Sequence, residues 1–565
     1  MKKLSIFISI ILCLAFISTM LMGCNPTGNG GKDDGNDPVD DGIKAWESGE
    51  IVQSDSALYR DYYQIFVYSY CDSDGDGIGD LKGIESKLDY IAGLGFNGIW
   101  LSPIHPSNTE HCYDVENYYD VNSKFGTLKD FDDLVKAAHE KGISIMLDLV
   151  INHTSWKHPW FIKAQEAFGN PNHPDYKYVD YYRFNGSSTS YDKFGDESTM
   201  PKLNLDNQEV RAEIDNMCKF WLQTHGVDAF RLDAAWHFYY TNTAQNITFM
   251  QWLYSTAKKY NPDVYMVGEV WANDITVYSH YAESSVQSFF NFSLSTASGQ
   301  NNLMKLLNNL TDRSNKIKTV LQKKENGTTK GIDALFTSNH DTSRFSNMIG
   351  YVNNRTSDLD EAKMEWHRMS IALLYTQTGN VFHYYGNEIG MRNGLRSANG
   401  TGYTSSSYLD YTYRTAMNWG VNSTFDRNDG FAYAAYGYNT RFGEHDDYLG
   451  GVDEQINDQN SLYNYYRRVM LLRRQNPEIA QGKSTFVTTD DTDIMVIVRE
   501  YKGSKIVLVY NLNPEMELSY DLGSIAAQYG LEGKLAGFVS SNNDRDVTLN
   551  GSTVNLPQYS VAVIR

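Results

Sequence analysis

The stretch TLKDFDDLVKAAHEKGISIMLDLV, residues 127–150, contains the pattern that decides the fold. Thr127, followed three residues later by Asp130, is typical of a helix start, and the apolar residues of 131–138 share one helical face. After a glycine, residues 143–150 are almost all apolar, which indicates a strand buried on both faces. A helix followed by a doubly buried strand is the repeating unit of a parallel sheet.

The same unit recurs on both sides of this stretch. Towards the N-terminus the sequence predicts a strand at 64–67, a helix around 84–91 and a strand at 98–101. Further strands are predicted at 229–233, 265–269, 334–337 and 381–385. Alternation over roughly 400 residues favours the α/β class, and it fits a (β/α)8 TIM barrel with insertions better than an open sheet.

Two segments interrupt the alternation. Residues 152–204 are loop-like and contain several Trp and Tyr residues, which indicates an excursion from the end of one strand. Beyond Asn476 the pattern changes to short strands, at 493–498 and 506–510, without a strong helix. The sequence therefore predicts a barrel with one insertion and a small all-β domain after it.

Residues 1–24 resemble a bacterial export signal. Two lysines precede the apolar run 4–22, which is short for a membrane span. The run ends in Leu-Met-Gly-Cys24, which is similar to a lipobox, in which the cysteine is acylated; a signal with an incidental cysteine is the alternative. Residues 25–50 are rich in Gly, Asp and Pro and predict a flexible acidic linker. We therefore expect an exported lipoprotein on the outer face of a bacterial membrane.

The composition excludes several classes of protein. Of the 565 residues, 41% are hydrophobic and 21% are charged, which excludes wholesale disorder, collagen and a polytopic membrane protein. A formal net charge of −20 repels phosphate backbones, so nucleic acid is not an expected partner. The 41 Tyr residues suit sugar faces as well as core packing. Cys71, Cys112 and Cys218 are widely spaced and imply no disulfide framework.

Acidic side chains close several of the predicted strands. Asp233 and Glu269 each end a strand, and Asp341 follows a third. Asp148 lies in the strand quoted at the outset. The carboxyl ends of the strands form the active face of a (β/α)8 barrel. One acidic residue there is more often a salt-bridge partner than a catalyst, but several on separate strands indicate a catalytic site.

Four motifs identify the family that this sequence resembles. They are DLVINH at 148–153, GVDAFRLDAA at 226–235, GEVW at 268–271 and SNHD at 338–341. In this order they resemble the signature regions of the α-amylase family, glycoside hydrolase family 13. Further matches, from Tyr113-Asp114 to the helix at 465–468, extend the resemblance over about residues 59–475. The family's oligoglucosidase-like and neopullulanase-like members are the most similar in the motifs described below.

The resemblance implies a three-domain layout that agrees with the pattern of strands and helices. The A domain, a (β/α)8 TIM barrel, would comprise 51–152 and 205–475. An inserted B domain at 153–204 would follow the third strand, and a C-terminal antiparallel β-sandwich would comprise 476–565. The resemblance also implies a retaining glycosidase, which works with two carboxylates.

The same resemblance assigns roles within the site. Asp233 would be the nucleophile, Glu269 the general acid and base, and Asp341 a ligand of the sugar 2- and 3-hydroxyls that helps distort the ring. Arg231 should face the same way as Asp233 and keep the pKa of that carboxyl low, whereas Glu269 should have a raised pKa. Residues implied in substrate binding are Tyr113, His153, Arg231, His237 and His340.

A calcium loop is indicated at 72–80. Its sequence, DSDGDGIGD, places carboxylates at alternate positions with glycines between them. The twelfth position is Gly83 rather than Glu, so an EF-hand is not expected. The matching loop of oligoglucosidase-like and neopullulanase-like members binds Ca2+; an acidic solvated turn is the alternative. That resemblance implies as ligands Asp72, Asp74, Asp76, Asp80 and the carbonyl of Ile78. It also raises a second ion beside Asn152, whose other ligands would lie in the insertion, where no motif fixes them.

Two motifs bear on the preferred substrate. MPKLN at 200–204 resembles neopullulanase-like members, but those carry an extra N-terminal β domain, for which there is no room before Tyr59. RTAMNW at 414–419 departs from the RTPMQW of the oligo-1,6-glucosidase branch. We therefore expect an endo-acting α-amylase that hydrolyses α-1,4 bonds of starch-like α-glucans; a neopullulanase or cyclomaltodextrinase is the alternative. A glycan-binding lipoprotein without activity should lack the acid and the nucleophile, and both are present.

Overall fold

The computed structural model describes residues 44–52, 56–240, 242–296, 303–308, 311–351, 361–393, 410–420, 449–542 and 544–565. The predicted export signal at 1–24, its Cys24 and the linker up to residue 43 lie outside the described residues. Residues 44–565 form one compact unit. Within the described ranges, no helix combines the length and apolarity that crossing a membrane requires.

The end of the predicted linker is packed rather than flexible. Ala45–Ser48 forms a short 3-10 helix. The Trp46 ring packs against Phe538, with centroids 6.1 Å apart, and Glu47 lies 3.4 Å from the Arg467 guanidinium. The expectation of a flexible chain up to residue 50 is therefore wrong here, because an aromatic ring and a buried carboxylate find partners in the folded body.

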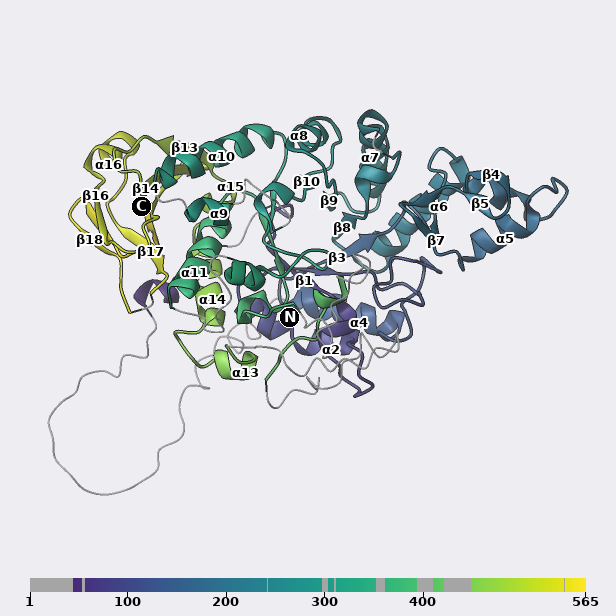
Figure 1. Ribbon diagram of the computed structural model, residues 1–565, viewed down its shortest axis with the longest axis horizontal. Helices are drawn as coiled ribbons and strands as arrows, with labels where there is room; N and C mark the ends of the chain where they lie inside the picture. Colours follow the sequence, from purple (N-terminus) through teal and green to yellow (C-terminus); the bar gives the residue numbers. More distant parts are fainter. Residues whose placement is uncertain are drawn as a thin grey trace, which may run out of the picture. The chain divides into compact units, whose positions relative to one another are not determined.

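Eight parallel strands form the central sheet, several of which are labelled in Figure 1. In chain order they are β1 Tyr62–Ile65, β2 Gly98–Leu101, β3 Ser144–Leu149, β8 Ala229–Leu232, β9 Tyr265–Gly268, β10 Ser288–Phe289, β11 Ala334–Phe336 and β12 Asn380–Tyr384. Hydrogen bonds connect them in the order β10-β9-β8-β3-β2-β1-β12-β11. An isolated parallel bridge between Phe290 and Ala334 joins the two outer strands, so the sheet curls into a nearly closed barrel. The predicted (β/α)8 class is confirmed.

Helices alternate with these strands. They are α2 Leu81–Ser86, α3 Leu88–Gly93, α4 Leu128–Glu140, α6 Gln208–Cys218, α7 Thr243–Ala257, α8 Asp274–Glu283, α9 Leu303–Leu307, α10 Arg313–Gly327, α11 Glu361–Tyr375, α13 Val452–Gln455 and α14 Leu462–Gln475. The start of α4 is the predicted one, because Thr127 and Asp130 form a reciprocal capping box. The helix predicted around 84–91 is instead divided between α2 and α3 at Lys87, whose backbone leaves helical geometry.

Aromatic rings fill the inside of the barrel. Tyr62 stacks on Tyr265 and Phe382, with centroids 5.6 and 4.9 Å apart, and Trp100 stacks on Phe290 at 5.2 Å. Because Tyr62 is part of this core, β1 begins two residues before the predicted strand at 64–67, and the chain turns into a 3-10 helix at Val67–Ser69. Strand β10 was not predicted, since two residues are too few to establish a periodicity.

The insertion after β3 has its own secondary structure. It contains α5 Pro159–Ala167 and the hairpins β4 Phe184–Ser187 with β5 Ser190–Tyr191 and β6 Lys193–Phe194 with β7 Glu197–Pro201, drawn in blue in Figure 1. Phe161 packs edge-on against Tyr182 and Tyr191, which gives the insertion a small core. The interpretation of this segment as a loop is therefore wrong, because short hairpins leave little periodicity. Its two ends meet where His153 and Lys202 form an antiparallel bridge.

The C-terminal region is a β-sandwich, as predicted. One antiparallel sheet has the order β13-β14-β15-β20-β17 and the other β16-β19-β18. Their bounds are β13 Lys483–Val487, β14 Ile494–Tyr501, β15 Ser504–Asn511, β16 Leu518–Asp521, β17 Leu535–Ser540, β18 Thr548–Asn550, β19 Thr553–Leu556 and β20 Ser560–Ile564. Val496, Val509 and Val554 belong to the apolar cluster between the sheets. Two short helices, α15 Glu478–Gln481 and α16 Gly523–Tyr529, accompany them.

Candidate active site

The acidic residues that follow the barrel strands gather at one cleft. Asp233 directly follows β8, Glu269 directly follows β9, and Asp341 lies five residues beyond β11. These three side chains line a cleft of about 810 Å3. Its other lining residues include Tyr113, His153, Trp156, Trp236, His237, Trp271 and Arg414. The cleft therefore opens at the carboxyl ends of the strands, where barrel chemistry takes place.

One buried guanidinium holds the carboxylates together. Arg231 Nη1 lies 2.7 Å from Asp233 Oδ1 and 2.5 Å from Asp148 Oδ1, and its Nη2 lies 3.1 Å from Glu269 Oε1. The indole of Trp100 donates a further hydrogen bond of 2.9 Å to Asp148. Because a guanidinium presents its donors in a fixed fork, Arg231 fixes the directions of three carboxylates at once.

Burial and the nearness of other carboxylates raise the pKa values of Asp233 and Glu269. Burial raises the pKa of Asp233; the Arg231 charge opposes this and the Asp341 carboxylate adds to it. The expectation that Arg231 would keep the pKa of Asp233 low is therefore wrong, because the effect of burial outweighs that of the cation. Burial also raises the pKa of Glu269, and Asp233 and Asp341 act in the same direction. This agrees with the raised pKa predicted for Glu269.

Asp341 is in the opposite state. Burial alone would raise its pKa, but His340, Arg414 and Arg231 more than offset that and lower it. Its carboxylate lies 3.0 Å from His340 Nε2 and 2.8 Å from Arg414 Nη2. Gln64 Nε2 lies 2.8 Å from the other ring nitrogen of His340, which leaves Nε2 as the N–H that faces Asp341. Asp341 is therefore a fixed anion, whereas the pKa values of the neighbouring carboxyls of Asp233 and Glu269 are raised.

Two of the predicted sugar-binding residues stack on one another. The rings of Tyr113 and His340 are nearly parallel, with centroids 5.5 Å apart. Tyr113 Oη lies 2.6 Å from His340 Nε2 and 3.3 Å from Arg231 Nη1. Because these contacts fix the Tyr113 ring against the carboxylate cluster, the ring can form one side of a sugar site.

The other two histidines line the same cleft. His153 Nε2 lies 3.1 Å from the carbonyl of Tyr113, and its ring stacks on Phe194 at 5.1 Å. His237 ends a 3-10 helix at Ala235–His237, just after Asp233, and is partly exposed. The structure thus brings together all eight residues predicted for catalysis and substrate binding. Their roles remain predictions.

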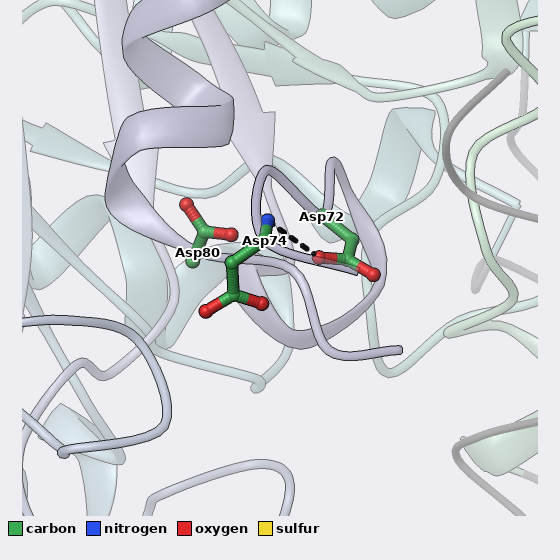
Figure 2. A group of neighbouring side chains, drawn as sticks. All are labelled: Asp72, Asp74 and Asp80. Carbon is green, nitrogen blue, oxygen red and sulfur yellow. Dashed lines mark hydrogen bonds between the residues drawn. The ribbon is translucent and has the colours of Figure 1, made fainter. Parts of the chain in front are cut away.

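The predicted calcium loop is only partly assembled. Oxygen atoms of Asp72, Asp74 and Asp80 all lie within 4.8 Å of one another (Figure 2). Among the predicted carboxylate ligands, Asp76 is not part of this group. Both oxygens of Asp72 accept backbone N–H groups of the loop, and Asp80 accepts the N–H of Gly83 as the N-cap of α2. Three hard carboxylate oxygens in one tight turn suit Ca2+ chemically.

Comparison with known proteins agrees with this geometry. The family model for the alpha amylase catalytic domain matches residues 64–482. The chain belongs to the α-amylase family of glycoside hydrolases. Alpha-amylase 3 of Dictyoglomus thermophilum is 34% identical over 469 residues, which cover 80% of this chain and 84% of the relative. An oligo-1,6-glucosidase of Bacillus cereus is 28% identical over 524 residues, covering 80% and 90%.

Two solved structures have the same fold as this chain. Eubacterium rectale Amy13B superposes with a TM-score of 0.76 at 34% identity and covers 92% of this chain and 96% of its own. The alpha-amylase from H. orenii has a TM-score of 0.68 at 30% identity and covers 90% and 99%.

Two parts of this α-amylase-family site were not predicted. The Arg414 side chain is buried against Asp341, and its Nε donates to the carbonyl of His340 at 3.1 Å. Arg414 stands in the RTAMNW motif, which by sequence bears only on substrate preference. The backbone N–H of Ala234 donates to Glu269 Oε2 at 3.0 Å, and this residue has a left-handed φ of 46°. No residue type signals that contact in the sequence.

Proposed function

We propose that this α-amylase-family hydrolase is a retaining, endo-acting α-amylase that cleaves α-1,4 bonds within starch-like glucans. The observation that carries the proposal is the grouping of Asp233, Glu269 and Asp341 in the lining of one open cleft. At about 810 Å3 this cleft lies near the upper end of the range of about 300–1,000 Å3 for ligand sites, so it has room for several sugar rings. Trp156 and Trp271, 50% and 46% exposed, offer ring faces along it.

The reaction would proceed by double displacement. The ionised Asp233 carboxylate attacks the anomeric carbon while Glu269 gives its proton to the leaving glycosidic oxygen, so a glycosyl ester forms and the C–O bond to the leaving sugar breaks. Glu269, now ionised, then takes a proton from water as the water attacks the same carbon, which regenerates both side chains. Arg231 contacts both carboxylates, so it would hold them in place as their charges exchange.

The remaining residues would bind sugar. Asp341, fixed by His340 and Arg414, would accept hydrogen bonds from the 2- and 3-hydroxyls of the ring under attack. Tyr113 would lie against the face of that ring, and His153 would hydrogen-bond it. His237 lies just beyond Asp233, where it would contact the sugar on the leaving-group side.

A calcium ion would stabilise the loop that follows β1. Asp72, Asp74 and Asp80 would hold it, because their oxygens form the one such acidic group in the described part of the chain. The ion would neutralise mutual repulsion of the carboxylates and fix the turn that leads into α2. Its contribution would be to stability, since the loop residues are not among those that line the cleft.

The protein would act outside the cell. Cys24, in the sequence Leu-Met-Gly-Cys, would carry the lipid, and the residues that follow would tether the enzyme. An endo-acting enzyme at the cell surface would cut polysaccharides that are too large to enter.

A substrate panel tests this proposal. The purified protein is incubated with soluble starch, pullulan, a cyclodextrin and isomaltose, while reducing ends, starch viscosity and the anomeric form of the products are followed. We expect starch viscosity to fall well before many reducing ends appear, with products released in the α form. Preference for pullulan or cyclodextrin would establish the neopullulanase-type alternative, which the MPKLN motif favours. Cleavage of isomaltose alone, or β products, would refute the proposal.

A further inference from the structure

A buried lysine lies beside the candidate active site and has no part in the chemistry above. Lys202 follows β7, where the insertion returns to the barrel, and is only 5% exposed. Its Nζ donates a hydrogen bond of 2.7 Å to Asn152 Oδ1 and another to the carbonyl oxygen of His237. The ring of Tyr240 covers the same ammonium, with Nζ 4.5 Å from the centroid.

The surroundings of this ammonium are those of a cation site. Within the part of the chain that the structure describes, no carboxylate lies within ion-pair distance of Lys202. An amide oxygen, a carbonyl oxygen and an aromatic face together satisfy a group that has three N–H donors. Tyr240 has a left-handed φ of 54°. This backbone conformation costs free energy for an aromatic residue, so it persists where the surrounding contacts stabilise it. Burial lowers the pKa of Lys202 to about 8, so the group is still mostly charged near neutral pH.

The position of Lys202 joins three parts of the site. Asn152 follows β3 and precedes His153, and the insertion leaves from there. Its return end pairs with the outgoing end, since Lys202 and His153 form an antiparallel bridge. The carbonyl of His237 lies in the turn that follows Asp233. One ammonium therefore connects the end of β3, the insertion and the turn after β8.

The residues present do not fit a second metal ion beside Asn152. The Asn152 oxygen that would coordinate the ion is already 2.7 Å from the Lys202 ammonium, and a divalent cation beside that charge would be repelled. We infer that the Lys202 ammonium is a built-in cation in place of a metal ion between the insertion and the barrel, and that it is the positioning residue for His153 and His237. The second half of this inference rests on the proposed function.

Its charge also acts on both histidines. Burial and, after it, the Lys202 charge lower the pKa of His153 to about 4. Burial and then Lys202 likewise lower the pKa of His237. Both rings are therefore neutral at pH 7, so each has one donor and one acceptor nitrogen.

Calcium binding to the full chain tests the first half without any activity. Isothermal titration calorimetry with CaCl2 is run on the wild-type protein and on Asp74→Asn, which removes a ligand of the 72–80 loop. We expect at most one equivalent for the wild type and none for Asp74→Asn. The inference would be overturned if Asp74→Asn still bound one equivalent of calcium and the double variant Asp74→Asn/Asn152→Ala bound none.

Replacement of the lysine tests the positioning role. Lys202→Ala should lower kcat/KM on the best substrate by about 10- to 100-fold, mainly through KM, because the two histidines lose their support. Methylammonium chloride should raise both the melting temperature and kcat/KM of this variant, with no effect on the wild type. The matched control is Lys163→Ala, a surface lysine on α5 that pairs with Asp175.

Two outcomes would overturn the positioning role. One is a folded Lys202→Ala with unchanged KM. The other is a variant whose melting temperature and kcat/KM both stay unchanged when methylammonium is added. If Lys202→Ala does not fold, Lys202→Met, which keeps the length of the side chain, takes its place and should show the same rise in KM. A wild type that cleaves no α-glucan would refute the proposed function, whereas calorimetry and melting still decide whether Lys202 is the cation.

Discussion

At the scale of single residues, the carboxylates that contact Arg231 outnumber the cations beside them. Arg231 contacts Asp148, Asp233 and Glu269, so one cation faces three buried carboxylates. Burial raises the pKa of Asp148 to about 7, and it raises those of Asp233 and Glu269. The free site therefore retains a proton under mildly acidic conditions, as a general acid requires. Asp341 differs because His340 and Arg414 both contact its carboxylate and together outweigh the effect of burial.

The first prediction concerns the nucleophile. Asp233→Asn is nearly isosteric but cannot form a glycosyl ester, so kcat should fall by at least about 10^4-fold, as for other removed nucleophiles. The melting temperature should change little, because an amide oxygen can still accept the Arg231 hydrogen bond. Hydrolysis of starch and circular dichroism measure the two effects. Asp133→Asn, an exposed change of the same type on α4, is the control and should be fully active; substantial turnover by purified Asp233→Asn would refute the assignment.

The second prediction concerns pH. Asp233 must be ionised to attack, so activity falls as the pH drops through its pKa, which lies above the ordinary 3.8. Glu269 must be protonated, so activity falls as the pH rises through its pKa, which lies above 4.5. We expect a bell-shaped profile of kcat/KM with both limbs displaced upwards from the ordinary carboxyl values. Limbs at or below those values would show that Arg231 dominates the cluster after all.

At the scale of elements, short loops after the strands do the positioning. The turn from β1 into α2 holds Asp72, Asp74 and Asp80 together, and Asp80 also caps α2. This loop has like charges within 4.8 Å of one another, so its folded form should be less stable without a counter-ion.

The third prediction follows from that repulsion. Excess EGTA should lower the melting temperature of the wild type, and restored CaCl2 should raise it, since a ligand at about 100 times its Kd stabilises by about 2.7 kcal/mol. Asp74→Asn should melt like the wild type in EGTA and gain nothing from CaCl2. Thermal unfolding with and without chelator measures this. Asp89→Asn, an exposed change on α3, should keep the calcium response; a wild type that ignores EGTA would rule out the ion.

At the scale of the whole molecule, the sandwich and the barrel are joined by ion pairs in which the arginine is buried and the carboxylate is partly exposed. Arg499 of β14 lies 2.8 Å from Glu325 of α10, and Arg313 of α10 lies 2.7 Å from Asp493. Removing the carboxylate of such a pair is costly, because the charge of the buried arginine is left without its partner. The two domains should therefore stabilise one another, which is consistent with one compact unit from residue 44 onward.

The fourth prediction concerns the attachment of that unit to a membrane. When the gene is expressed in a lipoprotein-processing bacterium fed a labelled fatty acid, the wild-type protein should take up label and sediment with membranes. Cys24→Ser should take up none and should be as active in solution, because Cys24 lies far along the chain from the site. Cys71→Ser is a control that should still be labelled. If Cys24→Ser took up label, or if the wild type took up none, Cys24 would be an incidental cysteine and not the acylated residue.

Much of this protein was determined by local sequence. The doubly buried strand at 143–150 and the capping box at Thr127 predicted the barrel, because apolar periodicity and end-capping act between near neighbours. The acidic residues at strand ends, Asp233 and Glu269, could be found in the same way, since all parallel strands of a barrel end at one face.

Only the tertiary structure decided how these residues behave. The raised pKa of Asp233 depends on its burial and on the nearby Asp341 carboxylate, and spacing along the chain reveals neither. The Arg414 contact with Asp341 and the Lys202 contact with Asn152 join segments that are 73 and 50 residues apart. Protonation and positioning depend on the distance in space between charges and on their burial, which the folded chain alone fixes.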